Sequence, residues 1–134
     1  TYYLQTNNFD LRPLFPSIGM GLLSTMILNI NNMRDIENDA QSNKRTIAVR
    51  LGLCHAKIYH TVLTLAMFAC FACYSFLYAH GSMCNFVYTI IYILQLIILI
   101  GIFKKEGALL DPFLRQTALS SFLIAILFSI SINL

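Results

Sequence analysis

The sequence predicts an all-α fold, an integral membrane helical bundle. The 134 residues are 57% hydrophobic, contain no Trp and are only 11% charged, which is too apolar and too lightly charged for an ordinary soluble domain. Four segments are also long and apolar enough to cross a bilayer, which takes about 20 mostly apolar residues. Within lipid each segment must be helical, because a helix satisfies all of its own backbone hydrogen-bonding groups.

The first expected helix spans about residues 14–31 and is the least hydrophobic of the four. It carries Gly19, Gly21, Ser24 and Asn29. Small residues allow close packing between membrane helices, and polar ones usually face the protein interior. We therefore expect this helix to lie centrally in the bundle and to deliver the polar segment that follows it.

The other three expected helices cover about residues 58–79, 85–103 and 113–132. The pair Asp111-Pro112 precedes the last of them and is typical of a turn followed by a helix start, because proline is tolerated in the first turn. The chain opens on TYYL, which resembles the last residues of an earlier helix. We expect residues 1–134 to be the C-terminal part of a single, longer transmembrane domain.

A polar stretch, NINNMRDIENDAQSNKRTIAVRLG (residues 29–52), carries the candidate site. Asn31, Asp35 and Asp39 are four residues apart, so a continuous helix would place them on one face with Cβ atoms about 6 Å apart. That spacing suits two carboxylates that bind Mg²⁺ and leave coordination positions for phosphate oxygens. Glu37 would point elsewhere on such a helix and is not part of the predicted site.

Two basic residues, Lys44 and Arg45, follow one to two turns later. They supply the positive charge that would hold a diphosphate against the metal. The alternative is a solvated polar loop between two membrane helices, which the regular spacing of the acids and the paired bases disfavour. A calcium-binding EF-hand starting at Asp35 is excluded, because its sixth position holds Ala40 instead of glycine.

The distribution of basic residues predicts how the chain lies in the membrane. Eight of the nine fall in two alternate connections: Arg34, Lys44, Arg45, Arg50, Lys57, Lys104, Lys105 and Arg115. The intervening turn, His80–Cys84, holds no Lys or Arg. By the positive-inside rule the two basic connections face the cytoplasm, and so does the candidate site. The net charge of +3 then reflects topology and requires no nucleic acid to explain it.

The segment NNMRDIENDAQSNKRTIAVRLG resembles the second conserved motif of the UbiA superfamily of membrane prenyltransferases. Within that superfamily, the form N-N-x-R-D-x-x-x-D…K-R-T-x-A-V-R-L-G is similar to the 1,4-dihydroxy-2-naphthoate polyprenyltransferases of menaquinone synthesis. The opening TYYLQT and the tail LLDPFLRQTALSSFLIAILF also resemble that subfamily. The resemblance therefore covers most of the chain.

The resemblance implies a nine-helix UbiA-type bundle in a bacterial inner membrane, of which this chain holds about half. It implies that Asp35 and Asp39 bind Mg²⁺ and, with Lys44, are catalytic. The residues that match diphosphate-binding positions are Asn31, Arg34, Lys44 and Arg45. The first Asp-rich motif of the family is absent from this chain, so we expect the chain alone to be inactive.

The implied reaction transfers a polyprenyl group from polyprenyl diphosphate to 1,4-dihydroxy-2-naphthoate with decarboxylation, giving demethylmenaquinone, CO₂ and diphosphate. Mg²⁺ and the basic pair would stabilise the charge that grows on the departing diphosphate. A cavity within the membrane would keep water from the electron-poor allylic carbon.

Other functions remain open. A UbiA-type enzyme could use a different aromatic or lipid acceptor. A transporter or channel segment could line an ion path with acidic residues, but that function predicts charges near mid-membrane, and the acids here follow the end of an expected helix. A purely structural membrane subunit leaves the regular spacing of the acids unexplained.

Overall fold

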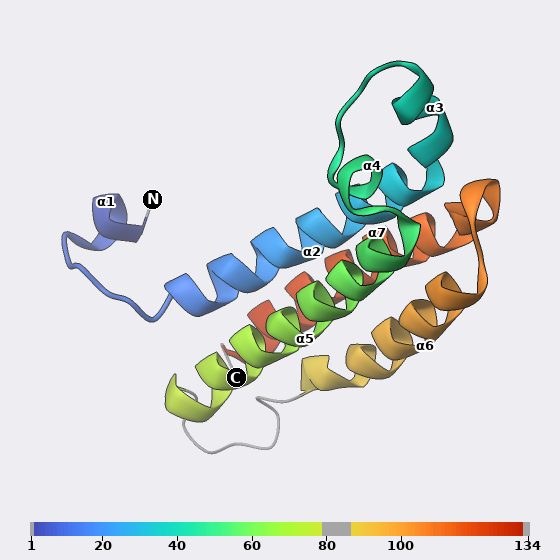
Figure 1. Cartoon of the computed structure of the whole chain (residues 1–134). Coiled ribbons are helices and arrows are strands. Elements are labelled where there is room, and N and C mark those ends of the chain that lie inside the picture. Colours follow the sequence, from blue (N-terminus) through green and yellow to red (C-terminus); the bar gives the residue numbers. More distant parts are fainter. Residues whose placement is uncertain (1, 79–86, 133–134) are drawn as a thin grey trace.

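A computed structural model of the chain describes residues 2–78 and 87–132, and every regular element among them is helical (Figure 1). The long helices are α2 (Leu14–Arg34), α5 (Leu53–Tyr78), α6 (Ile90–Lys104) and α7 (Asp111–Ser131). The short elements are α1 (Tyr2–Thr6), α3 (Ile36–Gln41), α4 (Ile47–Leu51) and the 3₁₀ turn η2 (Gly107–Leu110). The predicted all-α fold class is confirmed.

Helices occupy all four segments that were expected to cross a membrane, and each is long and apolar enough to do so. Helix α2 continues beyond the predicted residue 31, and α5 starts well before the predicted residue 58. The predicted start of the third helix near residue 85 and the turn His80–Cys84 lie outside the described residues.

The four long helices form a ring in which neighbours pack side by side. Helix α2 packs on α5 and α7, and α6 packs on the same two helices (Figure 1). Within the described residues α2 is thus one member of a ring, and its predicted central place in the whole bundle stays a prediction. Helix α2 also contacts the short elements α3, α4 and η2. These elements and the connections beside them form one end of the bundle, called the polar end below.

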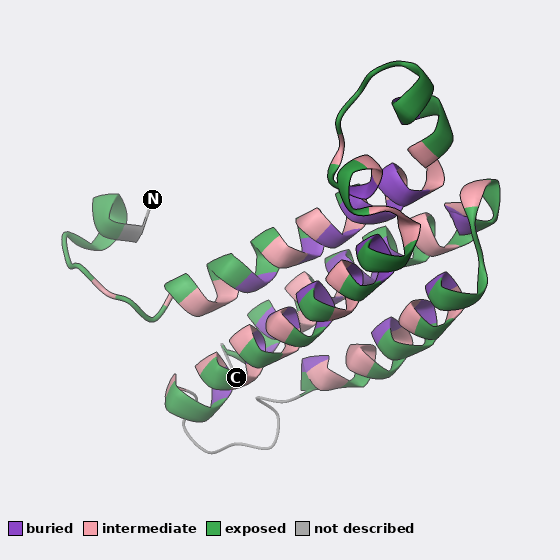
Figure 2. Cartoon of the chain, viewed as in Figure 1, coloured by how far each residue is buried: buried purple, intermediate pink, exposed green. Residues whose placement is uncertain are grey.

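Two clusters of buried side chains fill the ring. One gathers around Met26, Met67 and Phe71, and the other lies nearer the polar end around Met33 and Ile102. Exposed residues cover the outward faces of the long helices (Figure 2). Many of these are large and apolar, including Leu28, Val62, Ile97 and Phe122, each more than half exposed. An apolar outer surface is what a helix bundle presents to lipid.

The two basic connections lie at the same end of the bundle. Helices α3 and α4 follow α2 there, and the α6–η2–α7 connection lies beside them (Figure 1). Thr46 caps α4 by accepting a hydrogen bond from Val49 N at 3.3 Å. Gly52 then ends α4 with a φ of 77°, which favours glycine, and the chain enters α5. The polar segment is thereby folded back onto the end of the bundle.

Gly101 is expected to be required where α6 meets α7. A Cβ atom at this position would come closer to the Phe113 ring than van der Waals contact allows. Gly101→Val should therefore lower the stability of the full-length protein by about 1–3 kcal/mol through overpacking. Thermal unfolding in detergent measures the loss, and the double variant with Phe113→Leu should recover part of it. An unchanged unfolding midpoint for Gly101→Val would show that this contact does not limit helix packing.

Candidate functional site

The candidate site lies where α2 gives way to α3. The sequence predicted one uninterrupted helical face from Asn31 to Asp39, and this is wrong, because α2 ends at Arg34 and α3 starts at Ile36. Asp35, with φ −96° and ψ 12°, forms the bend. Aspartate is a poor helix former because its carboxylate competes for backbone groups. Hydrogen bonds from Asp35 N to Asn31 O (3.1 Å) and from Asp39 N to Asp35 O (2.8 Å) still keep helical spacing across the bend.

Arg34 brings several polar side chains together. Its Nε and Nη2 atoms donate to the two carboxylate oxygens of Asp35 at 2.8 and 2.7 Å. Nη2 also donates to Asn31 Oδ1, and Nη1 donates to Asp111 Oδ1, both at 2.9 Å. The family resemblance matched Arg34 to a diphosphate-binding position. In this structure its partners are two acids and one amide.

The environment of Asp35 favours its ionised form. The Arg34 guanidinium, which hydrogen-bonds both carboxylate oxygens, holds the pKa of Asp35 below its usual range. Partial burial opposes this effect, and the positive charge of Lys44 adds to it. Asp35 therefore stays negatively charged at neutral and mildly acidic pH, which is the form of a carboxylate that binds a cation.

Asp39 is the buried acid of the site and is only 7% exposed. Its Oδ1 atom accepts a hydrogen bond from Lys44 Nζ at 3.0 Å. Its Oδ2 atom is also buried and has no hydrogen-bond partner within residues 2–78 and 87–132. A buried carboxylate oxygen without a partner is energetically costly, so a bound cation or donor at this atom would be stabilising.

Lys44 reaches Asp39 because the chain turns back after α3. Asn43 adopts a left-handed conformation with a φ of 55°, which Asn tolerates better than most residues. Lys44 N then donates to Asp39 O at 2.8 Å. The Lys44 side chain is 60% exposed and Arg45 beside it is also exposed, so both cations are accessible to an anion from solvent.

The oxygen atoms of Asn31, Asp35 and Asp39 are of the type that Mg²⁺ prefers. The unpaired Oδ2 atom of Asp39 fits such an ion, whereas both oxygens of Asp35 are engaged by Arg34. Across the described ranges, no three His, Cys, Asp or Glu side chains gather closely enough to hold a metal together. The predicted ligands Asp35 and Asp39 can thus supply only part of a coordination shell.

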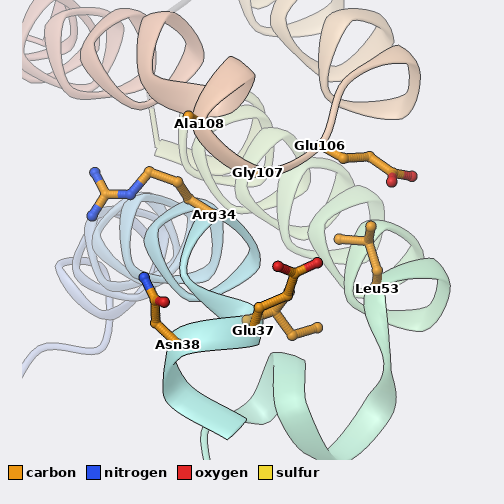
Figure 3. Close-up of a pocket in the computed structure, with 8 residues that line it drawn as sticks. Arg34, Glu37, Asn38, Leu53, Glu106, Gly107 and Ala108 are labelled. Atoms are coloured by element: carbon orange, nitrogen blue, oxygen red, sulfur yellow. The ribbon is translucent and has the colours of Figure 1, made fainter. Parts of the chain in front are cut away.

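A pocket of about 220 Å³ lies beside the site, between α3 and the α6–η2–α7 connection (Figure 3). The Glu37 carboxylate points into this gap toward Gly107, whereas Arg34 and Asn38 point to the opposite side (Figure 3). Pockets for small molecules usually exceed about 300 Å³. This pocket alone is therefore too small for a polyprenyl diphosphate.

Three charged residues outside the predicted site also join the polar end. Asp111, which the sequence assigned only to a helix start, is a partner of Arg34. Lys57 is buried, and its Nζ donates to Phe103 O at 3.3 Å and to Glu106 Oε1 at 3.4 Å. These pairs join residues 77 and 49 positions apart in the chain. No local spacing in the sequence predicts them.

Replacing Arg34 by Gln is expected to destabilise the full-length protein at neutral pH and less so in acid. The folded-state pKa of Asp35 lies below the unfolded value of about 3.9. The stabilisation from the pair is therefore present above that unfolded value and is lost as the pH falls through the lower folded value. Both side chains are partly exposed, so we expect a loss below about 1 kcal/mol at pH 7.

Thermal unfolding in detergent from pH 7 down to pH 3 measures this difference. Arg115→Gln, which removes an exposed arginine from α7, serves as the control and should show no such pH dependence. If the difference in unfolding midpoint between the wild type and Arg34→Gln stayed constant over the whole pH range, the stabilising Arg34–Asp35 pair would be contradicted.

Comparison with known proteins shows which sequences this chain resembles. Residues 1–111 match the UbiA prenyltransferase family. The chain is 38% identical to the 1,4-dihydroxy-2-naphthoate octaprenyltransferase of Haemophilus influenzae, over 98% of this chain and 43% of that protein. It is 37% identical to the Escherichia coli protein of the same name, over 60% of this chain and 26% of that protein. No solved structure matches the chain significantly.

A third relative of that name, from Mycobacterium leprae, is 41% identical over 49% of this chain and 22% of its own length. The chain thus spans less than half the length of these relatives. The family match covers the candidate site and extends to Asp111. With a helical membrane-type bundle and a match over most of its length, this chain belongs to the UbiA prenyltransferase family.

Proposed function

We propose that the full-length protein transfers a polyprenyl group from polyprenyl diphosphate to 1,4-dihydroxy-2-naphthoate, releasing CO₂ and diphosphate and giving the reduced, quinol form of demethylmenaquinone. The names of the relatives support this pair of substrates. The observation that carries the proposal is the buried Asp39 carboxylate, with one oxygen paired to Lys44 and the other without a partner among the described residues. It follows the end of a membrane-length helix, where a diphosphate can approach from water.

Asp35 and Asp39 are the residues that would hold Mg²⁺, which when bound supplies positive charge to the diphosphate leaving group. Lys44 and Arg45, both exposed, bind the diphosphate oxygens. Asn31 and Arg34 lie on the α2 side of the same site and add a polar and a positively charged contact. The chain's own cations thus neutralise much of the charge that diphosphate brings.

The proposed reaction breaks the bond between the allylic carbon and a diphosphate oxygen, and the electron pair leaves with the diphosphate. Lys44 and Arg45 stabilise that charge as it develops. A new bond forms between the allylic carbon and the ring carbon that carries the carboxylate. The electron pair of the carbon–carboxylate bond then returns to the ring as CO₂ departs. The apolar bundle limits access of water to the allylic carbon.

We further propose that the chain is the C-terminal part of one transmembrane prenyltransferase domain in a bacterial inner membrane, with the site facing the cytoplasm. Four helices have the length and hydropathy for crossing a membrane. Both basic connections lie at the same end of the bundle, where the positive-inside rule expects the cytoplasm (Figure 1).

Product analysis tests the proposed reaction. The purified full-length protein is incubated with polyprenyl diphosphate and 1,4-dihydroxy-2-naphthoate, with and without Mg²⁺, and the products are identified by mass spectrometry. We expect a prenylated, decarboxylated product that depends on Mg²⁺. If the protein prenylated a different aromatic acid and gave no naphthoate product, the proposed acceptor would be wrong but prenyl transfer would stand. Ion flux in vesicles without any prenylation would contradict prenyl transfer.

A further inference from the structure

The α6–η2–α7 connection places an acid, Asp111, against the candidate site. Asp111 begins α7, where a negative charge interacts favourably with the helix dipole. Leu110 just before it is fully buried, and Lys57 ties the same connection to α5 through Phe103 O and Glu106. The backbone at Asp111 is therefore held in place, and its half-exposed carboxylate reaches Arg34 Nη1 at 2.9 Å.

The charges around Arg34 do not balance. Arg34 carries one positive charge and pairs with two carboxylates, those of Asp35 and Asp111. The neighbouring pair of Asp39 and Lys44 is neutral by itself. These five side chains together hold one excess negative charge, which a bound cation would offset. Without Asp111 the same group would be neutral.

Asp111 also affects how readily Asp35 can change partners. A cation can bind Asp35 only if at least one of the two hydrogen bonds from Arg34 to that carboxylate breaks. The Arg34 side chain is only 27% exposed, so leaving it unpaired would be costly. Its contact with Asp111 keeps it paired while it releases Asp35.

We propose that Asp111 is a positioning residue that keeps Arg34 paired when the Asp35 carboxylate exchanges its hydrogen bonds from Arg34 for a divalent cation. The inference deepens the proposed function and rests on it, in that Asp35 is taken to bind the metal of that reaction. Asp111 itself acts through Arg34 and is not a metal ligand.

Mn²⁺ binding by the full-length protein tests this role without requiring prenyl transfer. Binding is followed by electron paramagnetic resonance in the presence of inorganic diphosphate. Asp111→Asn should weaken Mn²⁺ affinity about three- to fivefold, the range expected for a partly exposed ion pair. Glu37→Gln, which removes an exposed acid of α3 that pairs with none of these five side chains, should leave the affinity unchanged.

A double-variant comparison separates positioning from a general structural effect. In an Arg34→Gln background, Asp111→Asn should cause no further loss of Mn²⁺ affinity, because the partner through which it acts is gone. Asp111→Glu, which keeps the charge, should restore most of the affinity. An equal loss in both backgrounds, or an unchanged affinity in Asp111→Asn, would overturn the proposal. If the wild type binds Mn²⁺ as expected but forms no prenylated product, the proposed reaction fails and the role of Asp111 stands.

Discussion

Asp39→Asn in the full-length protein is expected to lower the rate of Mg²⁺-dependent prenyl transfer about 10²–10³-fold, the usual cost of removing one preorganised electrostatic group from a reacting centre. Asparagine keeps the shape of the side chain. It removes the negative charge that pairs with Lys44, and with it the anionic Oδ2 atom, which has no partner among the described residues. Rates at saturating prenyl diphosphate over a series of Mg²⁺ concentrations measure the effect.

Glu37→Gln is the matched control for this change. Glu37 lies on the same short helix, α3, but is exposed, and its carboxylate points into the gap beside Gly107 (Figure 3). We expect its rate to stay within about twofold of the wild type, as for other surface substitutions away from a site. A rate for Asp39→Asn close to that of Glu37→Gln would remove the basis for the metal assignment.

Lys44→Ala is expected to raise the KM for prenyl diphosphate about 10–100-fold, with a smaller fall in kcat. Hydrogen bonds to charged groups contribute about 1.5–3 kcal/mol, which corresponds to that range. Lys44 also pairs with Asp39 Oδ1 at 3.0 Å, so its loss removes the positive charge that faces this oxygen. Initial rates over a range of prenyl diphosphate concentrations separate KM from kcat.

Lys105→Ala removes an exposed lysine at the same end of the bundle and controls for the general effect of charge on a polyanionic substrate. It should change KM by no more than about twofold at physiological salt, because exposed charges are screened there. A lower kcat for Lys44→Ala with an unchanged KM would contradict its role in binding the diphosphate of the unreacted substrate. It would instead indicate an effect on the charge that develops during the reaction, or an indirect effect through Asp39.

The sequence predicted the helices well because each rests on a long apolar run that must be helical in a membrane. It misplaced the start of α5, since polar residues at His55 and Lys57 lower the local hydropathy. In the structure Lys57 is buried, and its ammonium group donates to the backbone carbonyl of Phe103, near the C-terminal end of α6. Gly52 ends α4 immediately before, so the new helix begins at Leu53.

The candidate site shows what spacing can and cannot predict. The four-residue interval between Asn31, Asp35 and Asp39 matches the backbone hydrogen bonds that link them, from Asp35 N to Asn31 O and from Asp39 N to Asp35 O. It does not reveal the bend itself. Nor does it reveal that Asp111 shares Arg34 with Asp35, since that contact depends on how α7 packs beside α2.

Asp39 and Asp35 are proposed to bind a cation that in turn binds the diphosphate. A structure of the full-length protein with Mn²⁺ and an unreactive prenyl thiodiphosphate tests this proposal most directly, because anomalous scattering locates the ion. We predict a Mn²⁺ ion in direct contact with Asp39 Oδ2, with Lys44 Nζ in contact with the diphosphate. A Mn²⁺ ion and diphosphate bound elsewhere, with Asp39 still in contact only with Lys44, would contradict the proposal.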